Sequence, residues 1–274
     1  ASDMDIFEAS VVLGNFYLNG VYVNKDIDKA IFYFEKAAKK DDTEALNLLG
    51  IIYSDGSCGK YDFDKAVEYW SRGLELNDVD CIFNLGLLYS NELYKGKDDQ
   101  KTISLLSIAA EKNLLEAQFL LGHYYYLGKF EKNYLYQFNI GNIHLSNKNS
   151  KMDLDKSVYY FTKAANQNCT HAQILLGNIY LSYKYYKRDI DKSIYYFTQA
   201  AKKGNSTAQL SLGFIYKSDL YNRVDIKKSL YYLELAASQN VPKAYYFFGL
   251  IYLEGKHVPK DINKLNVNTQ NNDN

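Results

Sequence analysis

A glycine returns every 36 residues along most of this 274-residue chain, each time directly after a leucine, isoleucine or phenylalanine. A period of this length is typical of a solenoid, in which each unit buries its apolar face only against its neighbours. The repeat therefore limits the fold more than any other feature of the chain. The glycines form two series with the same internal spacing: Gly14, Gly50, Gly86 and Gly122, then Gly141, Gly177, Gly213 and Gly249.

Residues 44–79 show what one repeat contains. Ala45, Leu49 and Ile52 follow helical spacing, which predicts a first helix with an apolar stripe on one side. Gly50 lies inside this helix, where glycine costs about 1 kcal/mol relative to alanine. Because the glycine recurs in every repeat, we expect it to allow a partner helix to approach closely.

The second helix of each repeat is expected to begin after an aspartate, whose carboxylate accepts backbone N–H groups and favours the positive end of the helix dipole. A lysine, an aromatic pair and two small residues follow, so that large side chains face small ones between neighbouring hairpins. The pattern predicts antiparallel helix pairs and an all-α fold. The aspartates are Asp26, Asp62, Asp98, Asp153, Asp189 and Asp225.

The order of these residues resembles the Sel1-like repeat, a relative of the tetratricopeptide repeat. Leu49-Gly50, Tyr33-Phe34 and Ala37-Ala38 carry the resemblance, which covers roughly residues 6–262. It implies a right-handed α-solenoid of antiparallel helix pairs that serves as an adaptor or scaffold. Some members assist membrane-protein degradation, others activate cell-wall synthases, and a cysteine-rich secreted branch has been linked to penicillin binding. That branch carries a disulfide in every repeat, whereas no repeat here holds a cysteine pair.

The array is irregular near residues 128–132. Gly122 and Gly177 are 55 residues apart, whereas two repeats need 72. Three interpretations remain open: the second series packs in an altered register, a first-type helix near 133–146 replaces a missing partner, or residues have been removed between two distant segments. We expect repeats over 5–127 and over 133–262, followed by a disordered, Asn-rich tail at 263–274.

Composition excludes several classes of function. The 32 basic and 32 acidic residues balance, which argues against nucleic acid as the ligand, and no apolar run is long enough to span a membrane. Cys58, Cys81 and Cys169 occupy unrelated repeat positions and favour a reducing, cytoplasmic location. A secretory location remains an alternative if a signal segment was removed, because Asn168 and Asn205 match the glycosylation pattern.

No arrangement of residues indicates catalysis, and we expect no catalytic residue, no bound metal and no cofactor. The four histidines occupy different elements and form no zinc-ligand spacing. The glycines are single and follow the repeat, so none builds a phosphate-binding loop. The aspartates have a role as helix caps, and no serine or cysteine lies in a nucleophile-elbow sequence.

The concave groove lined by the first helices is the predicted partner site. Positions directly after the repeat glycine, or three residues before it, mix asparagine with aromatic and aliphatic residues. Asparagine amides can bond an extended peptide backbone while aromatic rings take its side chains. The predicted groove residues are Asn15, Asn47, Phe83, Phe119, His123, Asn142, Asn178 and Phe214.

A second candidate surface lies on the outer side of the second helices, one residue before the core tyrosine. Its aromatic residues recur about once per repeat and either contact a partner, mediate self-association or lie flat as a shield over the neighbouring hairpin. These residues are Phe32, Tyr159, Tyr195 and Tyr231.

The sequence predicts a non-enzymatic scaffold that binds a peptide or protein segment. Two alternatives stay open: an adaptor subunit of a membrane-associated or ER degradation-type complex, and a repeat protein that interacts with the cell wall or with β-lactams. The sequence identifies neither the partner nor the pathway.

Overall fold

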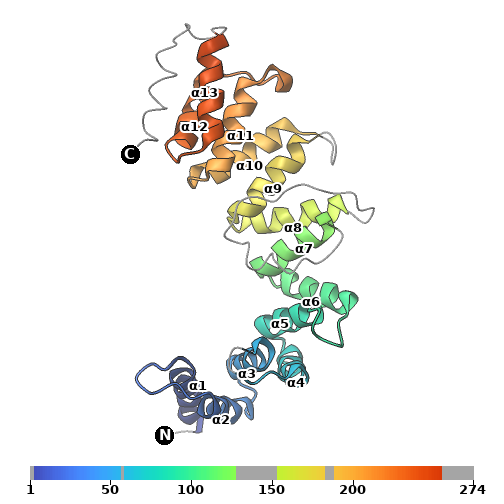
Figure 1. The fold of residues 1–274 in the computed structure, drawn as a ribbon. Helices are drawn as coiled ribbons and strands as arrows, with labels where there is room; N and C mark the ends of the chain where they lie inside the picture. Colours follow the sequence, from blue (N-terminus) through green and yellow to red (C-terminus); the bar gives the residue numbers. More distant parts are fainter. Residues whose placement is uncertain (1–2, 57–58, 128–152, 183–187, 255–274) are drawn as a thin grey trace. The chain divides into compact units, whose positions relative to one another are not determined.

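The computed structural model describes residues 3–56, 59–127, 153–182 and 188–254 (Figure 1). Every regular element in these ranges is a helix, and none of them contains a strand, which confirms the all-α prediction. In chain order the helices are α1 (Asp3–Asn19), α2 (Ile27–Ala38), α3 (Thr43–Asp55), α4 (Phe63–Glu75), α5 (Val79–Tyr89), α6 (Asp99–Glu111), α7 (Leu115–Leu127), α8 (Leu154–Asn166), α9 (Thr170–Leu181), α10 (Ile190–Lys202), α11 (Ser206–Lys217), the 3-10 turn η2 (Asp219–Tyr221), α12 (Ile226–Ala237) and α13 (Pro242–Glu254).

The described residues form two compact units, unit 1 with residues 3–124 and unit 2 with residues 125–254. In unit 1, α1 packs on α2, α3 on α4 and α5 on α6, while in unit 2, α9 packs on α10 and α11 on α12. Successive pairs also touch, since α4 contacts α5 and α10 contacts α11. Each unit is therefore a stretch of α-solenoid. The predicted boundary at 128–132 and the predicted tail at 263–274 lie outside the described residues.

Aspartate caps begin the second helix of each pair, as predicted. The Asp189 carboxylate accepts the backbone N–H of Lys192 at 3.0 Å, and Asp225 does the same for Lys228. Capping of this kind pairs one of the N–H groups that the first turn leaves without an intrahelical partner. The same cap is present at Asp26, Asp62, Asp98 and Asp153.

The repeat glycine brings the two helices of a pair together. A Cβ atom placed on Gly177 lies 2.7 Å from Cε1 of Phe197, whose ring is fully buried on α10. On Gly213 it lies 2.6 Å from Leu233, which occupies the same position on α12. Real Cβ contacts are longer than this, so the expected close approach at the glycine is confirmed.

A set of tyrosine contacts joins the two helices of each hairpin. We call this set the tyrosine clamp. In unit 2 the Asp189 backbone N–H donates to the Tyr180 carbonyl oxygen at 2.9 Å. The Lys192 ammonium lies 5.0 Å from the centre of the Tyr180 ring and 3.7 Å from the Asp189 carboxylate. Tyr196, from the second helix, stacks on Tyr180 with the ring centres 6.0 Å apart. One lysine thus binds both an anion and an aromatic face.

The clamp recurs in both units and accounts for many of the 28 tyrosines of the chain. In five repeats the stacked ring pair has centres between 5.7 and 6.1 Å apart and planes within 9° of parallel. Burial raises the pKa of Tyr180 and of Tyr216, so both phenols stay protonated at neutral pH. The stacked pairs are Tyr17–Tyr33, Tyr53–Tyr69, Tyr125–Tyr160, Tyr180–Tyr196 and Tyr216–Tyr232.

The irregular region contains an extended repeat. Tyr125, in the last turn of α7, accepts the Asp153 backbone N–H at 2.8 Å and stacks on Tyr160 of α8 at 5.8 Å. The partner that one of the three interpretations took as missing is therefore present, because α8 supplies the clamp to α7. Gly122 and Asp153 are 31 residues apart, against 12 in the other repeats, which leaves 19 additional residues between them. The first-type helix expected near 133–146 lies outside the described residues.

Candidate functional site

Side chains directly after the repeat glycine form the first candidate surface, which we call the post-glycine row. Its members face away from the glycine contact with the second helix, and only His123 among the described ones is buried. Ile51 has 38% of its surface exposed, a large fraction for an aliphatic residue inside a helix pair. The half-buried members are Asn15, Leu87, Asn178, Phe214 and Leu250.

Asn47, three residues before the glycine of its repeat, serves the fold more than a surface. Asn47 accepts the Trp70 indole N–H at 3.0 Å and the Asn84 amide N–H at 2.8 Å, so its side-chain oxygen links three helices of unit 1. Phe83 is half-buried next to this network. An amide that already holds two donors is a weak candidate for bonding a peptide backbone.

Two of the predicted groove residues lie in the interior. Phe119 and His123 have 4% and 2% of their surfaces exposed, and their ring centres are 4.7 Å apart in an edge-to-face arrangement. A side chain at this depth does not touch a surface-bound peptide, so neither residue belongs to a groove surface in this structure. Asn142, the remaining groove candidate, lies outside the described residues.

The outer aromatic residues are exposed. Between 49% and 61% of the surface of each residue is exposed to solvent. Each also lies edge-on against the clamp tyrosine that follows it, with ring centres 5.1–5.3 Å apart. Half of each residue therefore covers its own hairpin while the other half remains available for contact. These residues are Phe32 on α2, Tyr159 on α8, Tyr195 on α10 and Tyr231 on α12.

A pocket of about 340 Å³ opens in unit 2 between α11, η2, the start of α12 and α13. Phe214 is the only predicted groove residue in its wall. The Lys217 ammonium pairs with the Glu254 carboxylate at 2.8 Å across it. The sequence analysis missed Lys217, Glu254 and Phe247. They depart from the residues that the preceding repeat carries at the same register, Leu181, Ser218 and Ser211, and that departure was the available signal.

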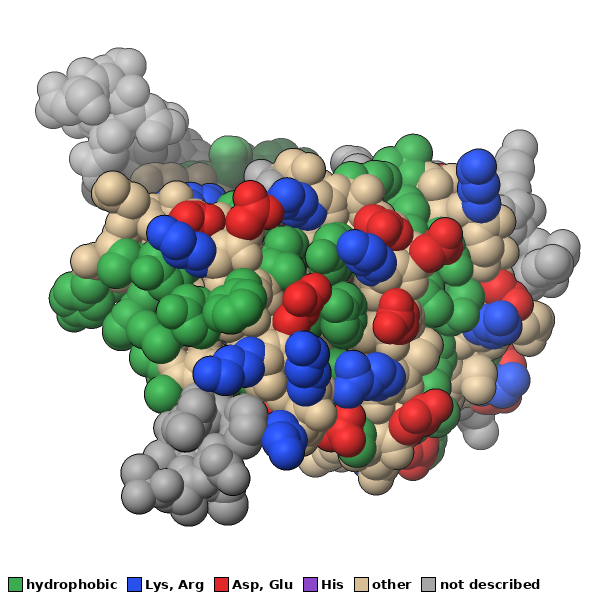
Figure 2. Space-filling view, turned by 90° about the horizontal axis from the view of Figure 1, so that it is seen from below, with side chains coloured by type: hydrophobic (Ala, Val, Ile, Leu, Met, Phe, Trp, Pro, Cys, Tyr) green, Lys and Arg blue, Asp and Glu red, His purple; other side chains and the backbone are tan. Residues whose placement is uncertain are grey.

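Charge is balanced over the face of the molecule that Figure 2 shows, where acidic and basic side chains alternate and hydrophobic side chains gather at one side. In the residues that the structure describes, no group of three or more histidine, cysteine, aspartate or glutamate side chains is placed to hold a metal ion. Nor does the described part of the chain contain a helix both long and apolar enough to cross a bilayer.

Comparison with known proteins identifies the repeats. The family model described as Sel1 repeat matches residues 8–42, 43–78, 79–114, 115–135, 137–169, 170–205, 206–241 and 242–264. Among the curated proteins compared with it, none matches the chain.

Two solved structures are similar to this chain, and the first shows the same fold. The structure of a Sel1 repeat protein from Oxalobacter formigenes is 25% identical over 85% of this chain and 88% of its own, with a TM-score of 0.58. A protective antigen present in uropathogenic Escherichia coli strains, which displays an SLR fold, is 22% identical over 98% of this chain and 62% of its own, with a TM-score of 0.49. With eight matched repeats covering nearly all of its length, this chain belongs to the Sel1-repeat family.

Proposed function

We propose that this protein is a non-enzymatic scaffold that binds a peptide or protein segment along the post-glycine row of unit 1 or of unit 2. Sel1-repeat proteins are generally interaction scaffolds without catalytic activity, and the described residues hold no metal-binding cluster. The observation that carries the proposal is the exposure of the row. Its side chains are apolar or amide groups, yet only His123 among the described members is taken into the core.

The side chains of the row suit the backbone and apolar side chains of an extended segment more than they suit charged side chains. Ile51 and Leu87 offer apolar contact in unit 1, while Asn178 offers an amide donor and acceptor and Phe214 an aromatic ring in unit 2. A bound strand presents backbone N–H and C=O groups to such amides and side chains to such apolar positions. Apart from His123, every described member of the row is an apolar or amide residue and carries no charge.

Affinity capture with the intact chain tests the proposal when it is run beside two variants. The row variant carries Ile51→Ser and Asn178→Ala, and the matched control carries Phe32→Ser and Tyr195→Ser on the outer surface. We expect a partner that the intact chain and the control retain and the row variant loses. Equal retention by all three proteins, after circular dichroism has shown equal helicity, would contradict binding through the row.

The outer aromatic residues support a second candidate, self-association. Tyr159, Tyr195 and Tyr231 recur on α8, α10 and α12 of unit 2, each about half exposed. Sedimentation equilibrium over a range of concentrations should show a mass that rises in the intact chain and stays monomeric when all three are serine. A monomer at every concentration would remove this candidate.

We further propose a cytoplasmic location. The described cysteines, Cys81 and Cys169, are buried, and burial raises the pKa of the Cys81 thiol, which lowers its reactivity. The Asn205 side-chain oxygen accepts the Ala208 N–H at 2.9 Å as the cap of α11. A glycan on Asn168 or Asn205 in cells, or capture of a labelled penicillin, would favour the secretory and cell-wall alternatives instead.

A further inference from the structure

One side of α1 carries an apolar stripe that is open to solvent, and we call it the α1 face. Its residues follow helical spacing, at i, i+3, i+4 and i+7, and they are Ala9, Val12, Leu13 and Phe16. Val12 and Leu13, in the middle of the stripe, have 50% and 38% of their surfaces exposed. A contiguous apolar stripe, unlike a single exposed side chain, marks an interaction site.

The same registers are covered in the repeats that follow. The register of Ala9 shows what covers them, because a Cβ atom on Gly73 of α4 would overlap the Cys81 side chain of α5. The second helix of the preceding repeat therefore packs on this side of the first helix, and α2 with α3 and α10 with α11 make the same contact. In α3, α5, α7, α9 and α11 the counterparts of Leu13 are at most 2% exposed, and they are Leu49, Leu85, Leu121, Leu176 and Leu212.

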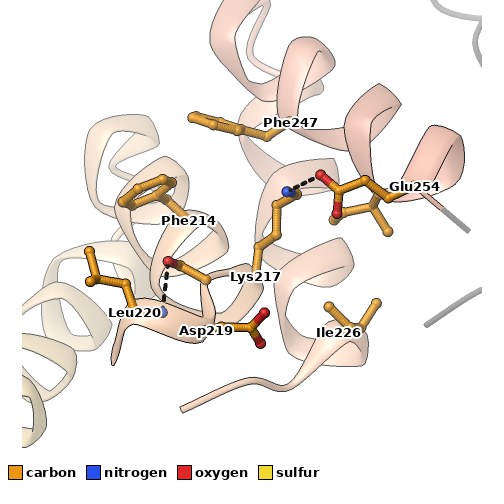
Figure 3. Close-up of a pocket in the computed structure, with 9 residues that line it drawn as sticks. Phe214, Lys217, Asp219, Leu220, Ile226, Phe247 and Glu254 are labelled. Carbon is orange, nitrogen blue, oxygen red and sulfur yellow. Dashed lines mark hydrogen bonds and ion pairs between the residues drawn. The ribbon is translucent and has the colours of Figure 1, made fainter. Parts of the chain in front are cut away.

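The helix α13 of unit 2 keeps these registers covered as well. Ala244 and Ile251 are the counterparts of Ala9 and Phe16. Both are buried, Ile251 in the wall of the pocket drawn in Figure 3, and α13 contacts the preceding helix α12. Among the described helices only α1 has none before it, so the α1 face has the composition of an internal contact without the helix that covers it elsewhere.

The α1 face is complementary to itself. An antiparallel pair of α1 helices, related by a two-fold axis between Val12 and Leu13, places Ala9 opposite Phe16 and Val12 opposite Leu13. A small side chain then faces a large one at both ends of the contact, as efficient packing requires. Phe16 is also larger than the isoleucine or leucine that α3, α5, α9 and α11 carry at its register. The spacing and the sizes of the side chains therefore fit a second copy of this helix.

Such a contact buries no charge. Residues 9–19 of α1 include no aspartate, glutamate, lysine or arginine, so no charged group has to lose its water. The end of a solenoid that meets water ordinarily has a polar outer face, which α1 does not have. Tyr22, which is exposed and lies edge-on to Phe16 with the ring centres 5.3 Å apart, extends the apolar area.

We propose that two copies of this chain associate through the α1 face, with the two α1 helices antiparallel. The contact continues the packing between successive hairpins across a two-fold axis. It uses none of the residues of the post-glycine row, so the inference goes beyond the proposed scaffold function and does not depend on it.

Sedimentation equilibrium of the whole chain tests the inference, beside charge variants of the two central residues. Val12→Lys and Leu13→Glu each place an unpaired charge in the contact, whereas a mixture of the two variants places an ammonium group opposite a carboxylate. Both residues are exposed in the single chain, so neither charge enters the core of unit 1. Leu93→Glu, at an exposed leucine between α5 and α6, is the control for the loss of an apolar surface residue.

We expect the intact chain and the Leu93→Glu control to sediment at twice the chain mass of 31.6 kDa. The dissociation constant of the dimer should rise about 30-fold or more in each α1 variant alone, the ratio typical of a central interface residue. The mixture should recover the dimer, which a variant that merely misfolds does not do.

An intact chain that is monomeric at every concentration would overturn the inference, and so would a dimer that survives Leu13→Glu. A mixture that stays monomeric, while circular dichroism shows both variants to be as helical as the intact chain, would also overturn it. The variant with serine at Tyr159, Tyr195 and Tyr231 separates this contact from the outer aromatic surface. It remains dimeric when the α1 face holds the copies together, and a monomer there would assign the association to the outer surface instead.

Discussion

Gly50 and Gly86 occupy the same register in neighbouring repeats of unit 1 but meet different partners. A Cβ on Gly50 would overlap the indole ring of Trp70, with Cδ1 at 2.8 Å and two further ring atoms closer still. A Cβ on Gly86 meets only Leu105, at 3.2 Å, and Leu106, at 3.4 Å. Because both glycines lie inside helices, replacement by alanine adds about 1 kcal/mol of helix propensity in each case. The difference between the two variants therefore isolates the cost of the overlap.

Overpacking of a well-filled core typically costs 1–3 kcal/mol, and displacement of Trp70 also stretches its 3.0 Å hydrogen bond to Asn47, worth about 1 kcal/mol. We expect Gly86→Ala to range from neutral to about 1 kcal/mol more stable. Gly50→Ala should be about 1–3 kcal/mol less stable than Gly86→Ala.

Trp70 is the only tryptophan of the chain and is 3% exposed, so urea unfolding followed by its fluorescence reports on this region of unit 1. Far-UV circular dichroism of the same samples checks that helices and fluorescence change together. A Gly50→Ala protein as stable as Gly86→Ala would refute the reasoning, since the register glycine would then have no packing role against the ring.

Two further predictions concern unit 2. The Ser229 hydroxyl donates to the buried Gly213 carbonyl oxygen at 2.7 Å. We expect Ser229→Ala, which installs the residue found at Ala66, to lower the unfolding free energy by about 1–2 kcal/mol, and an unchanged urea midpoint would contradict this. The Lys228 backbone N–H lowers the pKa of the Asp225 carboxyl. Its stabilising effect is therefore complete above the unfolded-state pKa of about 3.9 and is lost as the pH falls through the folded value. Asp225→Asn keeps a capping side chain and should flatten the acid limb of a stability–pH profile, whereas an identical limb would show that the cap charge is not involved.

Contacts within a hairpin were predictable because the same short-range physics repeats along the chain. An aspartate before a helix caps it, and a glycine opposite a large side chain permits close approach, whichever repeat contains them. The same close approach of glycine to a large side chain occurs at Gly177 with Phe197 and at Gly213 with Leu233. The burial of Phe119 and His123 was not predictable from their register, because Ile51 and Leu87, at the register of His123, are exposed and half-buried.

The extended repeat shows why spacing alone does not settle pairing. Gly141 also lies 12 residues before Asp153, so the register admits either first-type helix as the partner of α8. In the structure α7 takes this role, and Tyr125 stacks on Tyr160 with the planes 2° apart. His144 stands where Tyr125 stands in its own series. The tyrosine three residues after the glycine therefore identifies the partner helix of α8, which the spacing of the glycines does not.

The residues that form the turns between repeats are a second feature that the sequence contains and the predictions did not use. Asn77, Asn113, Asn168 and Asn240 adopt positive φ values between 59° and 71°, and Gly204 adopts 83° at the corresponding position. Asparagine tolerates this left-handed conformation better than other residues with a Cβ atom. Asparagine at this position in four repeats, with Asp41 and Gly204 in two others, is visible in the sequence and marks the sharp reversal into the next repeat.

The 19 additional residues between Gly122 and Asp153 have a mechanical consequence. An array whose pairs contact only their neighbours yields one pair at a time under tension. A repeat of 36 residues, pulled straight, lengthens the chain by about 120–130 Å, whereas the repeat that contains the additional residues releases about 180–200 Å. Stretching this molecule from its ends should therefore give a series of equal steps interrupted by one longer step, and the place of that step in the series marks the rupture of α7 from α8.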